Sequence, residues 1–140
     1  MPEPVLRAVR LGRVFGSGAA EVAACTDIDL ELHAGELVVI TGRSGSGKST
    51  LLNLLGSLDR PTSGSVFLGD LDLATATEAQ LVAVRRNDFG FVFQDSGLIP
   101  VLSAAENVEI PLRLSGVKPA DRETRVVELL DAVGLAGHAE

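Results

Sequence analysis

The protein is a chain of 140 residues, of which 46% are hydrophobic and 22% are charged, with a formal net charge of −7 at pH 7. This composition supplies enough apolar side chains for a packed core and excludes an intrinsically disordered chain. The excess of acidic residues argues against a nucleic-acid-binding protein, whose affinity would rest on Lys and Arg. Cys25 is the only cysteine, which excludes an internal disulfide and a multi-cysteine metal site and fits a reducing compartment.

The first part of the chain predicts strands followed by a leucine-rich helix. Loosely alternating apolar residues over 5–15 predict a strand, and the alternation of apolar with acidic residues over 28–32 predicts a second strand with one wet face. The continuous apolar run 37–40 predicts a strand buried on both faces, as in a parallel sheet. Leucines over 51–58 predict a helix.

The middle of the chain predicts two more strands on either side of a helix. Residues 65–70 are expected to form a short strand, and Thr77 is expected to cap a helix over 77–86. The run FGFVF over 89–93 is expected to be a strand that leads to Gln94 in a loop.

The last part of the chain predicts two helices. Ser103 and Glu106 have the spacing of a capping box at the start of the first helix, and Pro111 is expected to kink or end it. A second, amphipathic helix is predicted over 120–133, with Gly134 as its C-terminal cap.

The most specific local pattern lies over residues 42–49. The segment GRSGSGKS matches the pattern G-x-x-x-x-G-K-[ST] without a mismatch, and it lies between the predicted strand 37–40 and a predicted helix. Glycines let the backbone wrap around a phosphate group, and the N-terminal end of the following helix adds positive charge. Lys48 would place its ammonium against the terminal phosphates, and the Ser49 hydroxyl would ligate Mg²⁺. The sequence therefore predicts a binding site for a nucleoside triphosphate.

The order of the segments around this loop resembles that of one family. The run ITGRSGSGKSTLLNLLGSLDRPTSGSVFLGD, then FGFVFQ, then LIPVLSAAENVEIPL, is similar to the nucleotide-binding domain of ABC transporters, and most of all to bacterial ATPases of the lipoprotein-export and macrolide-efflux type. The resemblance covers essentially the whole chain. It implies an α/β fold of the P-loop NTPase class and ABC type, with an N-terminal antiparallel β segment, a partial parallel core that carries the Walker A loop, and the beginning of a helical subdomain. Residues 1–94 are expected to form the nucleotide-binding core, and residues 95–140 the beginning of the α-helical subdomain.

The resemblance also implies which residues bind ATP and Mg²⁺. Gln94 matches the Q-loop glutamine, whose side chain in this family touches Mg²⁺ and the attacking water, so Ser49 and Gln94 are the expected metal ligands. Phe15 stands where the family places an aromatic residue that stacks on adenine, with a core or strand-end aromatic as the alternative. The nucleotide-binding residues expected in this way are Phe15, Gly42, Arg43, Ser44, Gly45, Ser46, Gly47, Lys48, Ser49 and Thr50.

Several motifs of the family do not occur in the sequence. A Walker B motif needs four apolar residues that end in Asp, usually followed by Glu, and the nearest run, VVELLD over 126–131, is typical of an amphipathic helix. The signature LSGGQ, the D-loop and the switch histidine do not occur either. We therefore expect a truncated N-terminal portion of an ABC ATPase, which binds ATP without efficient hydrolysis. It would hold no complete catalytic set, and Gln94 would be its candidate for positioning water or metal.

The function implied by the resemblance is that of an ATP-binding subunit of an ABC transporter, which couples ATP binding and hydrolysis to export of lipoprotein, lipid-like or drug substrates by a membrane permease. Its expected partners are permease subunits and a second nucleotide-binding domain, without nucleic acid, at the cytoplasmic face of the membrane. The apolar segment 98–102 is either buried in the helical subdomain or in contact with a partner. Two alternatives stay open: an ABC ATPase that regulates cell-wall or division machinery, and a small P-loop kinase.

Overall fold

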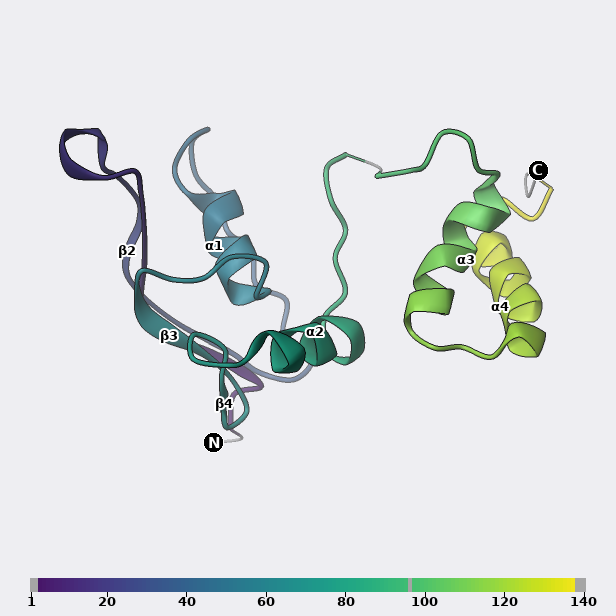
Figure 1. Ribbon diagram of the computed structural model, residues 1–140, viewed down its shortest axis with the longest axis horizontal. Coiled ribbons are helices and arrows are strands. Elements are labelled where there is room, and N and C mark those ends of the chain that lie inside the picture. Colours follow the sequence, from purple (N-terminus) through teal and green to yellow (C-terminus); the bar gives the residue numbers. More distant parts are fainter. Residues whose placement is uncertain (1–2, 96, 138–140) are drawn as a thin grey trace. The chain divides into compact units, whose positions relative to one another are not determined.

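The computed structural model describes residues 3–95 and 97–137. Figure 1 shows the elements in chain order: β1 (Leu6–Phe15), the short 3-10 helix η1 (Gly18–Ala20), β2 (Val22–Leu32), α1 (Lys48–Leu55), β3 (Ser63–Leu68), β4 (Leu71–Asp72), α2 (Glu78–Asn87), α3 (Ala104–Leu114) and α4 (Pro119–Ala132). The contacts divide the chain into two compact units, Met1–Arg85 and Arg86–Glu140. The first unit holds the sheet and α1, and the second holds α3 and α4.

The first unit is built on a four-stranded antiparallel sheet in the order β2-β1-β3-β4. In β1, Leu6 pairs with Leu32 of β2 and with Leu68 of β3, and Ala8 pairs with Val66 of β3. Leu6, Ala8 and Val66 are buried, so this row of side chains is the sheet's part of the core. The strands that were predicted from alternating residues are confirmed.

Strand β1 departs from regular alternation at Arg10. Between Ala8 and Leu11 the register against β2 shifts, and Arg10 adopts a φ of +45°. An extra residue in one strand loses its place in the hydrogen-bond ladder, and here the Arg10 N–H donates instead to Asp29 Oδ1 at 2.8 Å. The bulge lets both Ala8 and Leu11 be buried, which explains why the alternation in this part of the sequence is loose.

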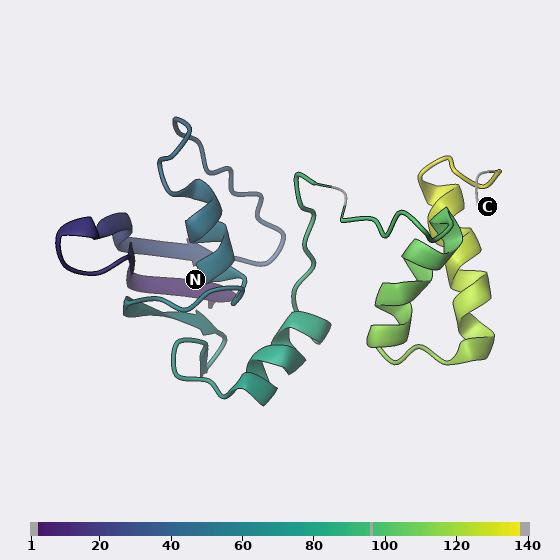
Figure 2. The ribbon, with the colours of Figure 1, turned by 45° about the horizontal axis from the view of Figure 1, so that its top comes forward.

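Helix α1 lies over the sheet in Figure 2, with Leu54 and Leu55 buried. The helix ends earlier than the leucines of the sequence predict. Ser57 adopts a left-handed φ of +57°, and the Leu58 N–H turns back to donate to the carbonyl oxygen of Asn53 at 2.8 Å. Leu58 therefore lies outside the helix and is exposed.

Helix α2 begins as the sequence predicts. The Thr77 hydroxyl accepts the Gln80 N–H at 3.3 Å, and Gln80 Oε1 accepts the Thr77 N–H at 2.9 Å, which is the reciprocal pair of a capping box. One face of the helix carries the buried residues Leu81 and Val84. Both side chains are among the buried apolar residues of the first unit.

Two apolar runs that predict strands are not strands in the structure. Residues 37–40 and 89–93 pair with no strand in the part of the chain that the structure describes, and Leu37, Val39 and Val92 are exposed. The parallel core strand over 37–40 and the strand over 89–93 are therefore wrong as predictions. An apolar run indicates a segment suited to burial, but a strand forms only where neighbouring strands supply hydrogen bonds.

The second unit consists of α3 packed against α4 and the segments around them. Helix α3 begins with the predicted capping box, in which the Ser103 hydroxyl accepts the Glu106 N–H at 3.2 Å and Glu106 Oε2 accepts the Ser103 N–H at 2.8 Å. Helix α4 ends at Ala132, and the predicted cap Gly134 has a φ of +76° and is followed by a bond from the Leu135 N–H to the Leu130 carbonyl at 2.8 Å. Both cap predictions are confirmed.

Pro111 lies inside α3 and does not end it, so of the two effects predicted for this proline the end of the helix is wrong, and a kink stays a prediction. The helix continues from Pro111 to Leu114. The proline ring removes one N–H donor, but its carbonyl oxygen still accepts the Ser115 N–H at 2.9 Å. The capping box at the start of α3 and the packing of α3 against α4 both favour the helix in spite of the lost bond.

The two units meet in the sequence between Arg85 and Arg86. A division after Gln94, between a nucleotide-binding core and a helical subdomain, stays a prediction. Among the helices described over residues 3–95 and 97–137, none has the length and apolar content needed to cross a membrane.

Candidate functional site

Residues 42–47 form a loop that leads into the N-terminal end of α1. Gly45 and Gly47 adopt left-handed φ angles of +77° and +86°, which glycine reaches without a steric penalty. Lys48 is the first residue of α1, and its Nζ donates to the carbonyl oxygens of Gly42 at 2.9 Å and of Arg43 at 2.7 Å. The loop, the lysine ammonium and the end of the helix therefore lie together.

The end of this loop is pressed against strand β2. A Cβ atom at Gly47 would collide with the carbonyl oxygen of Ala24, so only glycine fits there. The thiol of the neighbouring Cys25 lies 3.7 Å from the Gly47 carbonyl oxygen, to which it donates. Burial raises the pKa of the Cys25 thiol and keeps it protonated at neutral pH, as its role as a donor requires.

The N-terminal end of α1 is electrostatically suited to an anion. The first turn carries no acidic residue and begins with Lys48. The first hydrogen bond along the helix runs from the Leu51 N–H to the Gly47 carbonyl at 2.8 Å, so the amides of Lys48, Ser49 and Thr50 precede the helical ladder. Free amides at a helix N-terminus carry partial positive charge and bind phosphate groups.

Phe15 is the last residue of β1 and is 43% exposed, so of the alternative reading as a core or strand-end aromatic the core position is excluded and the strand-end position holds. The Arg13 guanidinium lies over its ring, 4.6 Å from the ring centroid. Arg13 in turn binds Asp59 through Nε and Nη2, each 2.9 Å from a carboxylate oxygen. Stacking of Phe15 on a nucleotide base stays a prediction.

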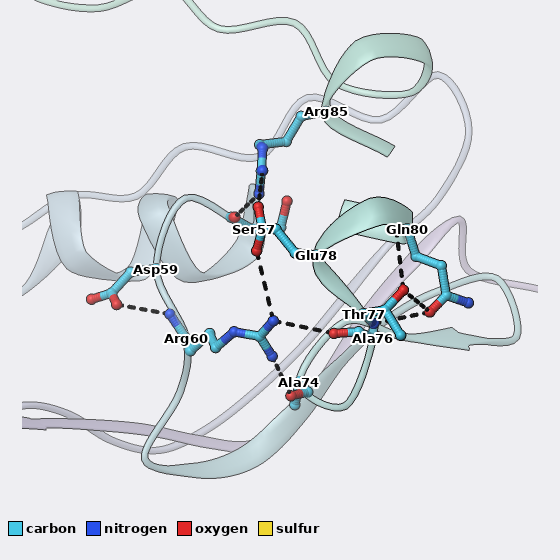
Figure 3. A network of polar contacts seen from close by, with 9 residues as sticks. All are labelled: Ser57, Asp59, Arg60, Ala74, Ala76, Thr77, Glu78, Gln80 and Arg85. Atoms are coloured by element: carbon cyan, nitrogen blue, oxygen red, sulfur yellow. Dashed lines mark hydrogen bonds and ion pairs between the residues drawn. The ribbon is translucent and has the colours of Figure 1, made fainter. Parts of the chain in front are cut away.

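The segment that follows α1 is fixed to α2 by a network of polar contacts (Figure 3). Arg85 of α2 donates to the Ser57 carbonyl oxygen at 3.0 Å and pairs with Glu78 at 2.6 Å. Arg60 donates to two carbonyl oxygens in the turn before α2 at 3.1 and 3.2 Å. The far end of the helix that carries the loop is therefore held in place by charged side chains.

Gln94 belongs to the second unit, where it is exposed and lies outside the helices and strands. Ser49, the other predicted metal ligand, is an exposed residue of the first unit. An approach of these two residues to one Mg²⁺ ion stays a prediction. His, Cys, Asp and Glu side chains form no group of three or more that would hold a metal ion within residues 3–95 and 97–137.

Asn107 binds the apolar segment 98–102 to the start of α3. Its Oδ1 accepts the Ile99 N–H at 2.8 Å, and its Nδ2 donates to three carbonyl oxygens between Ile99 and Ser103 at 2.9 to 3.2 Å. The segment is nevertheless mostly exposed, with Val101 at 88%. Together with α3 and α4 it lines an apolar cavity of about 650 Å³. Contact of this segment with a partner stays a prediction.

The sequence reasoning missed three side chains that organise these regions, namely Arg13, Asp59 and Asn107. Arg13 and Asp59 are separated by 46 positions, so no local pattern connects them. Asn107 follows the capping-box glutamate Glu106 directly. Asn side chains often bond to nearby backbone groups, so an Asn in the first turn of a predicted helix could have indicated these bonds from the sequence.

A glycine-rich loop of the pattern G-x-x-x-x-G-K-[ST] that holds a lysine ammonium at the N-terminus of a helix is typical of P-loop nucleoside-triphosphate-binding proteins. The comparisons with known proteins agree with this class. A family model described as "ABC transporter" matches residues 25–140. The chain belongs to the ABC transporter family, whose members bind and hydrolyse ATP.

Similar solved structures and curated relatives are cassettes and exporters of this family. The dimeric structure of the ATP-binding cassette MJ0796 in a post-hydrolysis state with ADP and Pi has a TM-score of 0.82 and 36% identity, over 90% of this chain and 56% of that chain. The macrolide export ATP-binding/permease protein MacB of Agrobacterium fabrum is 45% identical over 97% of this chain and 21% of its own length. The probable export ATP-binding/permease protein MacB of Pseudomonas entomophila is 48% identical over 97% of this chain and 20% of its own length. The chain thus spans about a fifth of the length of these relatives.

Proposed function

We propose that this chain is the ATP-binding part of an exporter in which ATP binding and hydrolysis drive a membrane permease. The observation that carries the proposal is the loop 42–47, with the Lys48 ammonium held against it at the N-terminal end of α1. Lys48 exchanges its two carbonyl acceptors for phosphate oxygens, which form stronger, charge-assisted hydrogen bonds. The amides of the loop and of the first turn of α1 hold the remaining oxygens.

Mg²⁺ fits this site through few protein ligands. The exposed Ser49 hydroxyl in the first turn of α1 would hold the ion, and the Gln94 amide oxygen would complete its protein ligands. The absence of a carboxylate group of three or more in the described residues is compatible with an ion held mainly by phosphate oxygens and water, as is usual for Mg²⁺. The bound ion would neutralise charge on the triphosphate.

The partners we propose are a membrane permease, on the cytoplasmic face of the membrane, and a second nucleotide-binding domain. The names of the relatives, which are export ATP-binding/permease proteins, favour transport over regulation of cell-wall machinery and over a small kinase. The dimeric form of the solved cassette supports pairing of two such domains. The mostly exposed segment 98–102 is our candidate for contact with the permease, and the substrates we propose are lipoprotein, lipid-like or drug molecules.

The proposal is tested by the substitution Lys48→Ala, with ATP binding to the 140-residue chain measured by calorimetry in excess Mg²⁺. We expect the Kd for ATP to rise about 10- to 100-fold, because a hydrogen bond to a charged group contributes about 1.5–3 kcal/mol. The matched control is Lys118→Ala, which removes the other lysine of the sequence, an exposed residue in the second unit. Equal ATP affinity in the Lys48→Ala variant and the unchanged chain would reject the proposed site.

A further inference from the structure

Arg13 and Asp59 form a paired contact between strand β1 and the segment that follows α1. Arg13 Nε lies 2.9 Å from Asp59 Oδ2, and Arg13 Nη2 lies 2.9 Å from Asp59 Oδ1. Two parallel bonds of this kind fix the plane of the guanidinium as well as its position. The side chains are only 23% and 28% exposed, so water and salt screen the pair less than a fully exposed one.

A second contact joins the same two segments beside this ion pair. Thr62 donates through its N–H and its hydroxyl to the Gly12 carbonyl oxygen, at 2.9 and 3.2 Å, and its hydroxyl oxygen accepts the Val14 N–H at 3.1 Å. Gly12 and Val14 are the neighbours of Arg13 in β1. The end of β1 is therefore bound to the segment after α1 at three consecutive residues.

Arg13 transmits this constraint to the ring of Phe15. Residues two apart on a strand point to the same side, and the Arg13 guanidinium lies 4.6 Å from the centroid of the Phe15 ring. Because Asp59 fixes the guanidinium, the guanidinium in turn restricts the orientation of the ring. The remaining exposed surface of Phe15, which is 43% exposed, is available to a flat ligand.

We propose that the Arg13–Asp59 pair is a positioning device for Phe15. It holds the ring where a nucleotide base stacks while the phosphates lie at the N-terminal end of α1. The inference rests on the proposed function, to which it adds the prediction that Phe15 stacks on the base of the bound nucleotide. Arg13 is a positioning residue, because it acts through the Phe15 ring, and Asp59 links base recognition to the helix that carries the phosphate loop.

The test compares two ligands that differ in the base. The Kd values for ATP and for inorganic tripolyphosphate, which carries similar charge without a base, are measured by calorimetry in excess Mg²⁺. The ratio of the Kd for tripolyphosphate to the Kd for ATP reports the contribution of the base. We expect Phe15→Ala to lower this ratio about 5-fold or more, since stacking of a base on an aromatic ring contributes about 1–3 kcal/mol.

Arg13→Gln and Asp59→Asn are each expected to lower the ratio about 2- to 5-fold, as the loss of a cation–π contact at a partly exposed site predicts. The double variant should lower the Kd ratio no further than either single variant does, because both substitutions remove the same Arg13–Asp59 pair. The sign for Asp59→Asn separates positioning from charge: loss of a negative charge would strengthen binding of any polyanion, whereas loss of positioning weakens ATP binding alone.

The matched control is Arg7→Gln. Arg7 also stacks on an aromatic ring, that of Phe67 at 4.7 Å, from the other end of β1, and its loss should leave both Kd values unchanged. Arg13→Lys keeps the positive charge but loses the paired bonds to Asp59. If Arg13→Gln does not fold, the Kd ratio of the Arg13→Lys variant tests the positioning role instead. Thermal melts establish which variants are folded.

The possible outcomes separate this inference from the proposed function. If Phe15→Ala lowers the ratio and folded Arg13 and Asp59 variants do not, the positioning role is wrong and the base-stacking role stands. If tripolyphosphate affinity falls as much as ATP affinity in the Arg13 variants, a charge effect replaces the positioning role. If Phe15→Ala leaves the ratio unchanged, base stacking itself is wrong, and the inference fails with it.

Discussion

At the scale of single residues, Gly47 has the most demanding position in the candidate site. It has a left-handed φ of +86°, it precedes the first residue of α1, and its α-carbon faces the carbonyl oxygen of Ala24 in β2. A side chain at this position would have to adopt an unfavourable backbone conformation and also displace the strand. Both the shape of the loop and its distance from the sheet therefore depend on this glycine.

We expect Gly47→Ala to lower the free energy of unfolding by about 2–5 kcal/mol, because a left-handed conformation costs about 1–2 kcal/mol and overpacking costs about 1–3 kcal/mol. Urea denaturation measures this change. The matched control is Gly69→Ala, since Gly69 also has a positive φ, of +54°, but a Cβ added there would meet no heavy atom within 4 Å. The control should lose only the conformational part, and equal losses in the two variants would disprove a collision with β2.

The phosphate loop and its neighbours differ in how far the sequence predicts them. The residues of the loop follow one another, so their spacing alone indicates a phosphate site. The contact of Gly47 with Ala24 and the pairing of Arg13 with Asp59 connect residues far apart in the chain. Such contacts depend on how strands and helices pack, and a single sequence carries no local pattern for them.

At the scale of helices and strands, local signals predict helix ends well and buried strands poorly. Ser103 and Gly134 cap their helices as predicted, because capping bonds form within a few residues of sequence. The run 89–93 illustrates the opposite case. Within this segment the rings of Phe91 and Phe93 stack at a centroid distance of 5.7 Å. In the described residues, however, the segment pairs with no neighbouring strand and is not part of the sheet.

The pair of helices α3 and α4 should lose stability in acid through Glu109. This carboxylate binds Arg113 on its own helix at 2.9 Å and Arg122 of α4 at 3.3 Å. The bond to Arg113, with the charges of both arginines, lowers the pKa of Glu109 below its ordinary value. In the unfolded chain the pKa returns to about 4.3. The stabilisation is therefore complete above about pH 5 and is lost as the pH falls through the lowered pKa.

Thermal melts of the unchanged chain and of Glu109→Gln measure this dependence. We expect the variant to melt a few degrees lower at pH 7 and at nearly the same temperature as the unchanged chain in acid below the lowered pKa of Glu109, where both side chains are neutral. Glu128→Gln is the control, because Glu128 pairs with Arg125 three residues away on α4, where both side chains are exposed. A difference between Glu109→Gln and the unchanged chain that persists in acid would mean that shape, not charge, stabilises the pair of helices.

At the scale of the whole molecule, the residues proposed to bind phosphate and those needed for hydrolysis are not the same. The loop 42–47 and α1 lie within the first unit, whereas Gln94 lies in the second unit. The sequence contains no run of four apolar residues that ends in Asp and precedes a Glu, the pattern that supplies the catalytic carboxylate of the family. The apolar run nearest to this pattern forms part of α4, an amphipathic helix with Val126 and Leu130 buried.

We therefore expect the 140-residue chain to bind ATP but to hydrolyse it at less than about 0.1 s⁻¹, roughly a hundredfold below a typical enzyme, because a general base contributes about 10²–10⁴ to a rate. A coupled assay for released phosphate measures the turnover, and Lys48→Ala serves as the blank for contaminating ATPases. Turnover that is faster, depends on Mg²⁺ and disappears in the Lys48→Ala variant would show that the chain contains its own catalytic base.

The contact between the phosphate loop and β2 also gives this protein a built-in reporter. Cys25 is the only cysteine in the sequence, it is 8% exposed, and its sulfur lies beside Gly47. Because the residue is buried and its sulfur contacts the loop, we expect a thiol reagent to reach this sulfur faster when the loop moves away from the strand. The rate at which Cys25 is alkylated therefore measures how often the loop opens, without any label added to the chain. A ligand that holds the loop closed would slow that reaction in proportion to the time it stays bound.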